Sequence, residues 1–232
     1  MTITPYLLEQ SSKDITTGTL ASVVMGKVRQ DILQGRLLPG TKLKLDSMRD
    51  EYEVSLSPLR EALSRLGAEG LVVMEDQKGY RVAPVSAQNL QEVTALRANL
   101  EVMAVAKSIE NGDDRWEDAL VAAYHRLQRM EESARQGVHL DGWDQAHRTF
   151  HIALFSASGL PLLLQFCNTL HDLSDRYRRL FLVKNAHDRD VPAEHKAILD
   201  AALARDKDLA CSLLRHHIER TGKNLFAILP PA

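Results

Sequence analysis

The sequence predicts a mainly α protein with two domains, a small N-terminal domain of helices and one β-hairpin and a larger all-helical C-terminal domain. Three observations predict this class. Apolar residues recur at helical spacing in residues 20–32 and 57–69. The pattern then changes to two short β-prone runs around a glycine turn within residues 71–82. From Asn89 to Phe226 the helical period returns with no further strand signal, so the second domain should contain helices alone.

Composition sets the broad class of the protein. The chain has 232 residues with 29 Lys+Arg and 31 Asp+Glu, so it is near-neutral and long enough for two domains. The chain has no run of 18 apolar residues that could span a bilayer, and its first residues lack the pattern of a secretory signal. We therefore expect a cytoplasmic protein with no membrane partner. Cys167 and Cys211 form no CxxC pair and are expected to be buried thiols.

The domain boundaries follow from breaks in these patterns. Residues 1–18 are polar and patternless and are interpreted as a mobile N-terminal arm. The two domains are placed at residues 19–84 and 91–228, with a linker at residues 85–90. Breaks are expected at Gly112, Gly137, Gly159-Leu160-Pro161 and Pro192, and they separate expected helices at residues 88–110, 115–136, 140–158, 161–183, 192–205 and 207–227.

The first domain has the pattern of a helix-turn-helix. Helices are expected at residues 20–32, 45–52 and 57–69, and only four residues separate the last two. We expect Ser57 to cap the third helix and Pro58 to occupy its first position, where the missing N–H costs nothing. The buried stripe of this helix should consist of Leu59, Ala62, Leu63 and Leu66.

The opposite face of the third helix is the candidate DNA contact. Arg60 lies in its first turn, where a guanidinium can bond guanine O6 and N7 together. Ser55 and Ser57 lie at the helix start, where hydroxyl and backbone N–H groups can hold phosphates. In the hairpin turn, Gly79 can adopt a positive φ, and Lys78 can reach the neighbouring groove or backbone. The alternative is that these side chains only solvate a helix face.

Charge does not decide between these alternatives, because residues 21–83 hold ten Lys/Arg against nine Asp/Glu. Three motifs do, namely Ile32-x-x-Gly35-x-Leu37-x-Pro39-Gly40, Tyr52-x-Val54-Ser55-x-Ser57-Pro58-Leu59-Arg60-Glu61-Ala62-Leu63-x-x-Leu66-x-x-Glu69-Gly70-Leu71-Val72, and Lys78-Gly79-Tyr80-x-Val82. Together they resemble the DNA-binding half of the GntR family, a winged helix-turn-helix whose hairpin is the wing. The resemblance implies DNA contacts by Ser55, Ser57, Arg60 and Gly79, followed by Arg49 and Lys78.

Four of the nine histidines have informative spacing in the second domain. His147 and His151 are four residues apart, so both imidazoles lie on one face of a helix. His195 and His217 lie on two later expected helices, and neutral imidazoles suit a borderline transition metal. The alternative is a partly exposed polar face. His216 should face outward, and surface or satisfied core positions are expected for His125, His139, His171 and His187.

The helical domain resembles the FCD domain of the FadR subgroup of the GntR family. The residues that carry this resemblance are Arg97-x-x-x-Glu101, Phe150-His151-x-Ala153-Leu154 before Gly159, Glu194-His195-x-x-Ile198-x-x-Ala201-Ala202-Leu203, and Ala210 to His217-Ile218. It implies that His151, His195 and His217 bind one metal ion together with an Asp. This chain has His147 where the Asp usually stands, and Asp144 lies three residues earlier, so either is the fourth ligand. Four imidazoles favour zinc, with nickel possible, over magnesium or manganese.

A metal ion with an open position can hold the carboxylate of an effector. Arg97 and Arg176 are candidate partners for the effector's carboxylates. The alternative is that Arg97 pairs with Glu101 at i+4 and that Arg176 lines a dimer face. The resemblance implies a small carboxylate effector, and residues 97–101, 146–151 and 175–178 look most like repressors of glutarate and 2-hydroxyglutarate utilisation.

The sequence is thus identified as a member of the GntR family, FadR subgroup. This resemblance implies a ligand-responsive regulator, expected to be a repressor, that binds a palindromic operator as a homodimer. It is not expected to be an enzyme, because it has no HExxH arrangement and no recognisable nucleophile turn. Two alternatives stay open, a metal-dependent enzyme tethered to DNA and a regulator whose metal is purely structural or absent.

Overall fold

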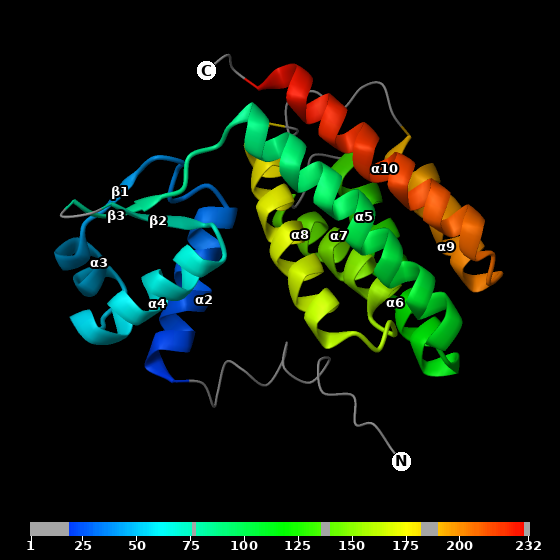
Figure 1. Cartoon of the computed structure of the whole chain (residues 1–232), viewed down its shortest axis with the longest axis horizontal. Coiled ribbons are helices and arrows are strands. Elements are labelled where there is room, and N and C mark those ends of the chain that lie inside the picture. Colours follow the sequence, from blue (N-terminus) through cyan, green and yellow to red (C-terminus); the bar gives the residue numbers. More distant parts are fainter. Residues whose placement is uncertain (1–18, 76–77, 136–139, 182–189, 230–232) are drawn as a thin grey trace. The chain divides into compact units, whose positions relative to one another are not determined.

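A computed structural model describes residues 19–75, 78–135, 140–181 and 190–229 (Figure 1). The expected mobile arm, residues 1–18, lies outside the described residues. The chain divides into two compact units, Met1–Val85 and Ser86–Ala232. Residues 87–90, expected to belong to a linker, are instead the first turn of a helix that begins at Ala87. Across the described ranges, we find no helix that is both long enough and apolar enough to cross a membrane.

The first unit is the expected winged helix-turn-helix (Figure 1). Its elements, in order, are α2 (Leu20–Leu33), β1 (Lys42–Leu43), α3 (Leu45–Glu51), α4 (Leu56–Ala68), β2 (Val72–Glu75) and β3 (Gly79–Val82). The antiparallel sheet has the order β1-β3-β2, and Tyr80 of β3 is opposite Leu43 on one side and Met74 on the other. The two-residue strand β1 was not expected, because a run this short has no periodicity to detect.

Helix α4 shows how local sequence determines which residues of this domain are buried and where its helices begin. Its expected apolar stripe is confirmed, since the side chains of Leu59, Ala62, Leu63 and Leu66 are fully buried. The expected cap is wrong, because the helix begins at Leu56 and its N-cap residue is Ser55, not Ser57. Pro58 is therefore the third helical residue, which is still in the first turn, where a backbone N–H has no partner within the helix. Gly79 opens β3 at φ +89°, the positive φ that its position in the turn requires.

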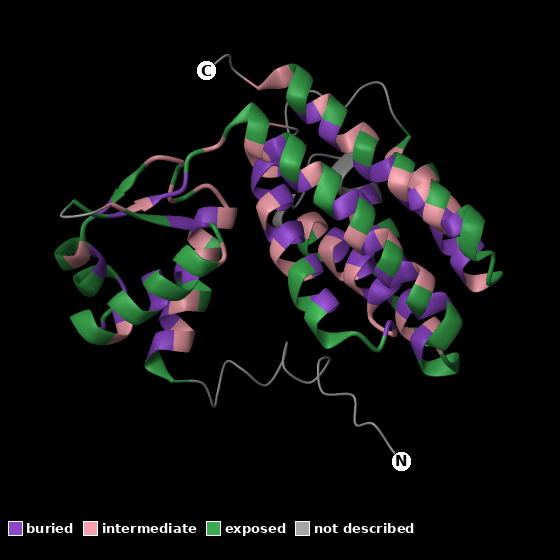
Figure 2. Cartoon of the chain, viewed as in Figure 1, coloured by how far each residue is buried: buried purple, intermediate pink, exposed green. Residues whose placement is uncertain are grey.

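The second unit contains helices alone in its described residues. They are α5 (Ala87–Asn111), α6 (Asp114–Arg135), α7 (Leu140–Phe155), α8 (Pro161–Phe181), α9 (Val191–Leu203) and α10 (Lys207–Ile228), close to the expected ranges. Helix α5 packs along α8 and α10, and α6 packs along α7 and α9 (Figure 1). Figure 2 shows buried residues along the inner faces of these helices. Leu120, Leu127 and Phe150 are part of one apolar core in this unit.

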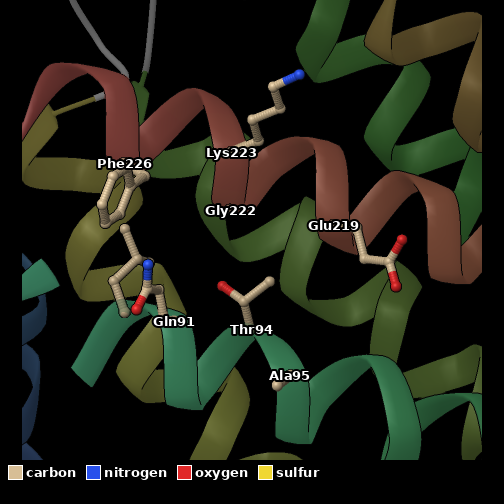
Figure 3. Close-up of a pocket in the computed structure, with 8 residues that line it drawn as sticks. Gln91, Thr94, Ala95, Glu219, Gly222, Lys223 and Phe226 are labelled. Atoms are coloured by element: carbon tan, nitrogen blue, oxygen red, sulfur yellow. The ribbon is translucent and has the colours of Figure 1, made fainter. Parts of the chain in front are cut away.

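Helices α5 and α10 approach each other closely at one glycine. A Cβ added at Gly222 would lie 2.5 Å from Cγ2 and Oγ1 of Thr94 and 3.0 Å from its Cβ. Figure 3 shows the two residues facing each other across a groove of about 410 Å³ between these helices. The groove is lined by Leu90, Gln91, Thr94, Ala95, Glu219, Gly222, Lys223 and Phe226, and none of these is a histidine.

Gly222→Ala should lower the free energy of unfolding by about 1–3 kcal/mol, because the added methyl group overlaps the stiff side chain of Thr94. The loss should occur although alanine is intrinsically the better helix former. Urea unfolding followed by circular dichroism measures it.

The matched control is Gly26→Ala on α2, where nothing lies within 4 Å of the added Cβ, so this change should be neutral or stabilising. Combining Gly222→Ala with Thr94→Ala should recover part of the lost stability, since the two atoms at 2.5 Å are removed. Equal behaviour of the Gly222 and Gly26 variants would contradict the contact.

Candidate functional site

The residues expected to contact DNA lie on the surface of the first unit. Ser55 and Ser57 at the start of α4 and Arg60 in its second turn are exposed. Lys78 and Gly79 in the wing are exposed as well. These positions leave the backbone N–H groups of the α4 start and the Arg60 guanidinium accessible to a nucleic acid.

The arginines of this surface differ in whether they form ion pairs. Arg49 of α3 pairs with Asp50 at 2.9 Å. Arg65 of α4 pairs with Glu61 one turn earlier at 2.5 Å. Within the part of the chain that the structure describes, Arg60 forms no ion pair, so its five N–H donors remain available to an acceptor.

The second unit buries the four singled-out histidines together. His147 and His151 come from α7, His195 from α9 and His217 from α10. One ring nitrogen of each lies within 4.8 Å of the others, and the residues are only 0–6% exposed. We call these four residues the histidine cluster.

Two carboxylates orient the histidine cluster from outside. Nδ1 of His195 lies 3.0 Å from Oε1 of Glu131 on α6, and Nδ1 of His217 lies 2.9 Å from Oε2 of Glu194 on α9. A carboxylate accepts from the Nδ1–H tautomer and so directs the lone pair of Nε2 the other way. These partners were not predictable from the sequence, because Glu131 is 64 residues from His195 and Glu194 pairs with His217 rather than with the adjacent His195.

The inner nitrogens of the cluster fit a metal ion. Nδ1 of His147, both ring nitrogens of His151 and Nε2 of His195 are buried without a hydrogen-bond partner among the described residues. Burial, together with the neighbouring histidines, lowers the pKa of His147 and His151 well below the usual value, so both are neutral at pH 7. Neutral imidazoles with unused lone pairs are the form that binds borderline divalent metals, and zinc or nickel would suit this donor set.

Asp144 lies outside the histidine cluster, so of the two candidates for fourth ligand the structure brings only His147 to it. The carboxylate of Asp144 pairs with Arg178 at 2.5 Å and with Arg179 at 2.6 Å. Trp143 of α7 lies between this network and the cluster. Its ring stacks on that of His147 at 4.9 Å between centroids, and Cζ of Arg178 lies 4.8 Å from the Trp143 ring centroid.

Arg97 forms the ion pair that the sequence left as an alternative. Its Nε donates to Oε1 of Glu101 at 2.6 Å and its Nη2 donates to Oε2 at 3.1 Å. Burial raises the pKa of Glu101, but the guanidinium of Arg97 outweighs burial and holds that pKa at about 2. Nη1 of Arg97 also donates to Ser174 at 2.7 Å, and Nη2 lies 3.1 Å from Nδ1 of His171.

His171 was expected to be an unremarkable surface or core residue, and the structure places it beside the histidine cluster. It is fully buried, with its ring centroid 5.4 Å from that of His151. Its Nε2 lies 3.6 Å from Oδ1 of Asp175, which also binds Arg178 at 2.9 Å. The spacing of the histidines did not indicate His171, but its i,i+4 relation to Asp175 on α8 is a signal that the sequence contains.

The remaining candidates are placed as follows. Arg176 of α8 is 3% exposed, and burial lowers its pKa to about 10. His216 and His125 are exposed, as expected for residues outside the cluster. Cys167 is buried and Cys211 is half-buried, both as free thiols. Gly137, His139 and His187 lie outside the described residues.

Comparisons with known proteins agree with this arrangement. A model of the FCD domain matches residues 92–220, and a model of bacterial regulatory proteins of the gntR family matches residues 20–82. The uncharacterized HTH-type transcriptional regulator BphR of Paraburkholderia xenovorans (strain LB400) is 41% identical over 87% of this chain and 83% of its own. The HTH-type transcriptional repressor GlaR of Escherichia coli (strain K12) is 38% identical over 82% of this chain and 89% of its own.

A solved structure shows the same fold. E. coli McbR/YncC superposes with a TM-score of 0.76 at 22% identity, over 90% of this chain and 98% of that chain. A winged helix-turn-helix joined to a helical domain of this type defines a transcriptional regulator that binds DNA, and the relatives are regulators rather than enzymes. The chain belongs to the gntR family of bacterial regulatory proteins and carries an FCD domain.

The buried histidines should make the stability of the metal-free protein depend on pH. His147 and His151 stay neutral in the folded state, whereas unfolding returns their pKa to the usual value near 6.5. The unfolded state therefore binds more protons below this pH, so the free energy of unfolding should fall as pH falls from 7.5 to 5.5. Each residue contributes up to about 1.4 kcal/mol per pH unit below 6.5.

Urea unfolding of chelated protein across this pH range measures the slope, and a His147→Asn, His151→Asn double variant is the control that should flatten it. Glu101 and Asp175, with pKa values of about 2, contribute only at lower pH and do not interfere. An unchanged slope in the double variant would contradict the assignment.

Proposed function

We propose that this protein is a ligand-responsive repressor whose helical domain binds a divalent metal ion in the histidine cluster and, beside it, a small dicarboxylate. The observation that carries this proposal is that ring nitrogens of His147, His151 and His195 are buried without a hydrogen-bond partner among the described residues. Glu131 and Glu194 orient His195 and His217 from outside. Leaving such polar atoms unbonded costs about 1–3 kcal/mol each, and a bound cation removes that cost. The relative named as a transcriptional repressor supports repression as the sign of control.

Charge favours an anionic effector. Four neutral ligands leave the full positive charge of a divalent ion in place, and such a site attracts an anion. The carboxylates Asp144, Asp172 and Asp175 beside it are ion-paired with arginines and so do not supply that anion. The effector thus supplies it, and the resemblance of residues 97–101, 146–151 and 175–178 to the repressors of glutarate and 2-hydroxyglutarate utilisation makes these two dicarboxylates our candidates.

Arg97 and Arg176 remain our candidates for the carboxylates of the effector. Both are buried, on α5 and α8, the second of which also carries His171. Because Arg97 already holds Glu101 and Ser174, its contact with an effector would add to these bonds or replace one of them.

Tyr177 offers a route from this site toward the DNA-binding unit. It lies on α8, two residues after Asp175, and its hydroxyl accepts from the backbone N–H of Ser86 and donates to Oδ1 of Asn89. Ser86 caps α5 at the first residue of the second unit. We propose that effector binding shifts α8, moves this attachment point and changes the spacing of two recognition helices in a homodimer on a palindromic operator. Half-sites of DNA tolerate little change in that spacing.

Removal of the metal should abolish effector binding. Wild-type protein should hold about one zinc or nickel ion per chain and bind glutarate or 2-hydroxyglutarate, and chelation should weaken that binding by more than about tenfold, because the metal supplies the charge that the anion meets. His151→Ala with His195→Ala should do the same. Elemental analysis and calorimetric titration of one sample measure both quantities.

The matched control is His216→Ala, since His216 is exposed and adjacent to His217 but outside the cluster, and it should keep metal and effector. Full metal stoichiometry in the double variant would refute the ligand assignment. Effector affinity that survives chelation would show that the metal is only structural.

Arg60→Ala should weaken binding to a specific operator by about 1–3 kcal/mol, the value of one bidentate contact with guanine, and should relax base preference at one position of each half-site. Fluorescence anisotropy with a duplex selected in vitro by the wild-type protein measures the affinity. Arg65→Ala, on the same helix but paired with Glu61, is the control with a smaller expected effect. Unchanged affinity in the Arg60 variant would mean that α4 is not the recognition helix.

A further inference from the structure

His171 has a buried nitrogen whose partner is missing. It is 0% exposed, and its Nε2 makes no hydrogen bond among the described residues. The ring lies next to the histidine cluster, with centroids 5.4 Å from His151 and 6.1 Å from His147. A buried polar atom in this state is costly, so its position calls for a hydrogen-bond or metal partner beyond the described residues.

One candidate for that ligand is a second metal ion. Single donor atoms of His147, His171 and Asp175 also lie within 4.8 Å of one another. Two contacts disfavour a metal there. Oδ1 of Asp175 already accepts from Arg178 at 2.9 Å, which places a fixed positive charge at the same oxygen.

The other contact fixes the tautomer of His171. Its Nδ1 lies 3.1 Å from Nη2 of Arg97, and a guanidinium can only donate hydrogen bonds, whereas Oε1 of Glu101 lies 3.7 Å from the same nitrogen, beyond a good hydrogen bond. Nδ1 must therefore be the acceptor, which puts the single proton of the neutral ring on Nε2. A protonated ring nitrogen has no lone pair for a metal, but it is a hydrogen-bond donor.

We infer that His171 is a specificity-determining residue that donates its Nε2–H to a carboxylate or hydroxyl oxygen of the effector, with Arg97 as the positioning residue that sets its tautomer. This inference rests on the proposed function and names the side chain that recognises the dicarboxylate. Among the described residues Nε2 of His171 has no hydrogen-bond partner, and Oδ1 of Asp175 lies 3.6 Å from it, beyond a good hydrogen bond. The proton on Nε2 is thus left for an oxygen atom that the effector brings.

Two substitutions at one position separate the two ring nitrogens. His171→Asn can place an amide oxygen near the Nδ1 position, where it accepts from Arg97, but it removes the donor at Nε2. His171→Gln reaches further and can return an amide N–H near the Nε2 position. Calorimetric titration of the zinc-loaded proteins with glutarate and 2-hydroxyglutarate should show affinity about tenfold weaker in His171→Asn and within about threefold of wild type in His171→Gln. Zinc content should stay at about one ion per chain in both.

A second measurement reads the tautomer directly. ¹⁵N NMR of histidine-labelled, zinc-loaded protein should show His171, identified by its loss in the Asn variant, as a neutral ring protonated on Nε2. A metal-bound Nε2, or a proton on Nδ1 instead, would overturn the inference.

The possible failures are distinct. If wild-type protein binds neither dicarboxylate, the proposed function is wrong. If wild type binds one of them and both variants bind it equally well, or both lose it equally, the role of His171 is wrong while the proposed function stands. Loss of zinc in either variant would instead make His171 a metal ligand.

Discussion

The main constraint on the helical domain is that it buries histidine ring nitrogens that form no hydrogen bond with the described residues. Four imidazoles meet inside the bundle, and several of their nitrogens have no hydrogen-bond partner among the described residues. Burial of such groups without hydrogen bonds opposes folding, whereas ordinary apolar packing around Leu120, Leu127 and Phe150 favours it. Binding of the proposed metal ion would reverse the sign of this polar contribution, and it would link folding, metal affinity and effector response in one cluster.

The surrounding ion pairs keep nearby carboxylates away from the histidine cluster. Arginines hold Glu101, Asp144 and Asp175, so these carboxylates are kept from coordinating the cation that the histidines would bind. Glu131 and Glu194 act differently, because they accept from the outer nitrogens of His195 and His217 and so aim the inner nitrogens at one point. Under the proposed function, this division of the acids into two groups would leave the charge of the metal ion available to an external anion.

Local patterns in the sequence predicted most of the fold. The stripe of α4, the glycine at φ +89° in the wing and the helices of the second unit follow from residues within a few positions of one another. The errors also had local causes. Strand β1 is too short to show a period, and Ser55 and Ser57 are equally good caps by residue type, so propensity alone could not select between them.

The site was predictable only where its residues share a helix or match a family motif. His147 and His151 were found from their spacing, but the contact between Arg97 and His171 joins residues 74 positions apart. The pairing of Glu131 with His195 spans 64 positions. Such contacts are set by how α5, α6, α8 and α9 pack, which no periodicity in a single segment encodes.

The stacking of Trp143 on His147 makes Trp143 an intrinsic fluorescence probe of the histidine cluster. The chain has only two tryptophans, and the other, Trp116, is buried with its indole N–H bonded to the carbonyl of Ala153. Trp143 alone has its ring in contact with a histidine of the cluster and with the guanidinium of Arg178. A change in the protonation or metal binding of His147 should therefore alter the fluorescence of Trp143 and not that of Trp116. The intrinsic fluorescence of Trp143 can thus report on the histidine cluster without an added label.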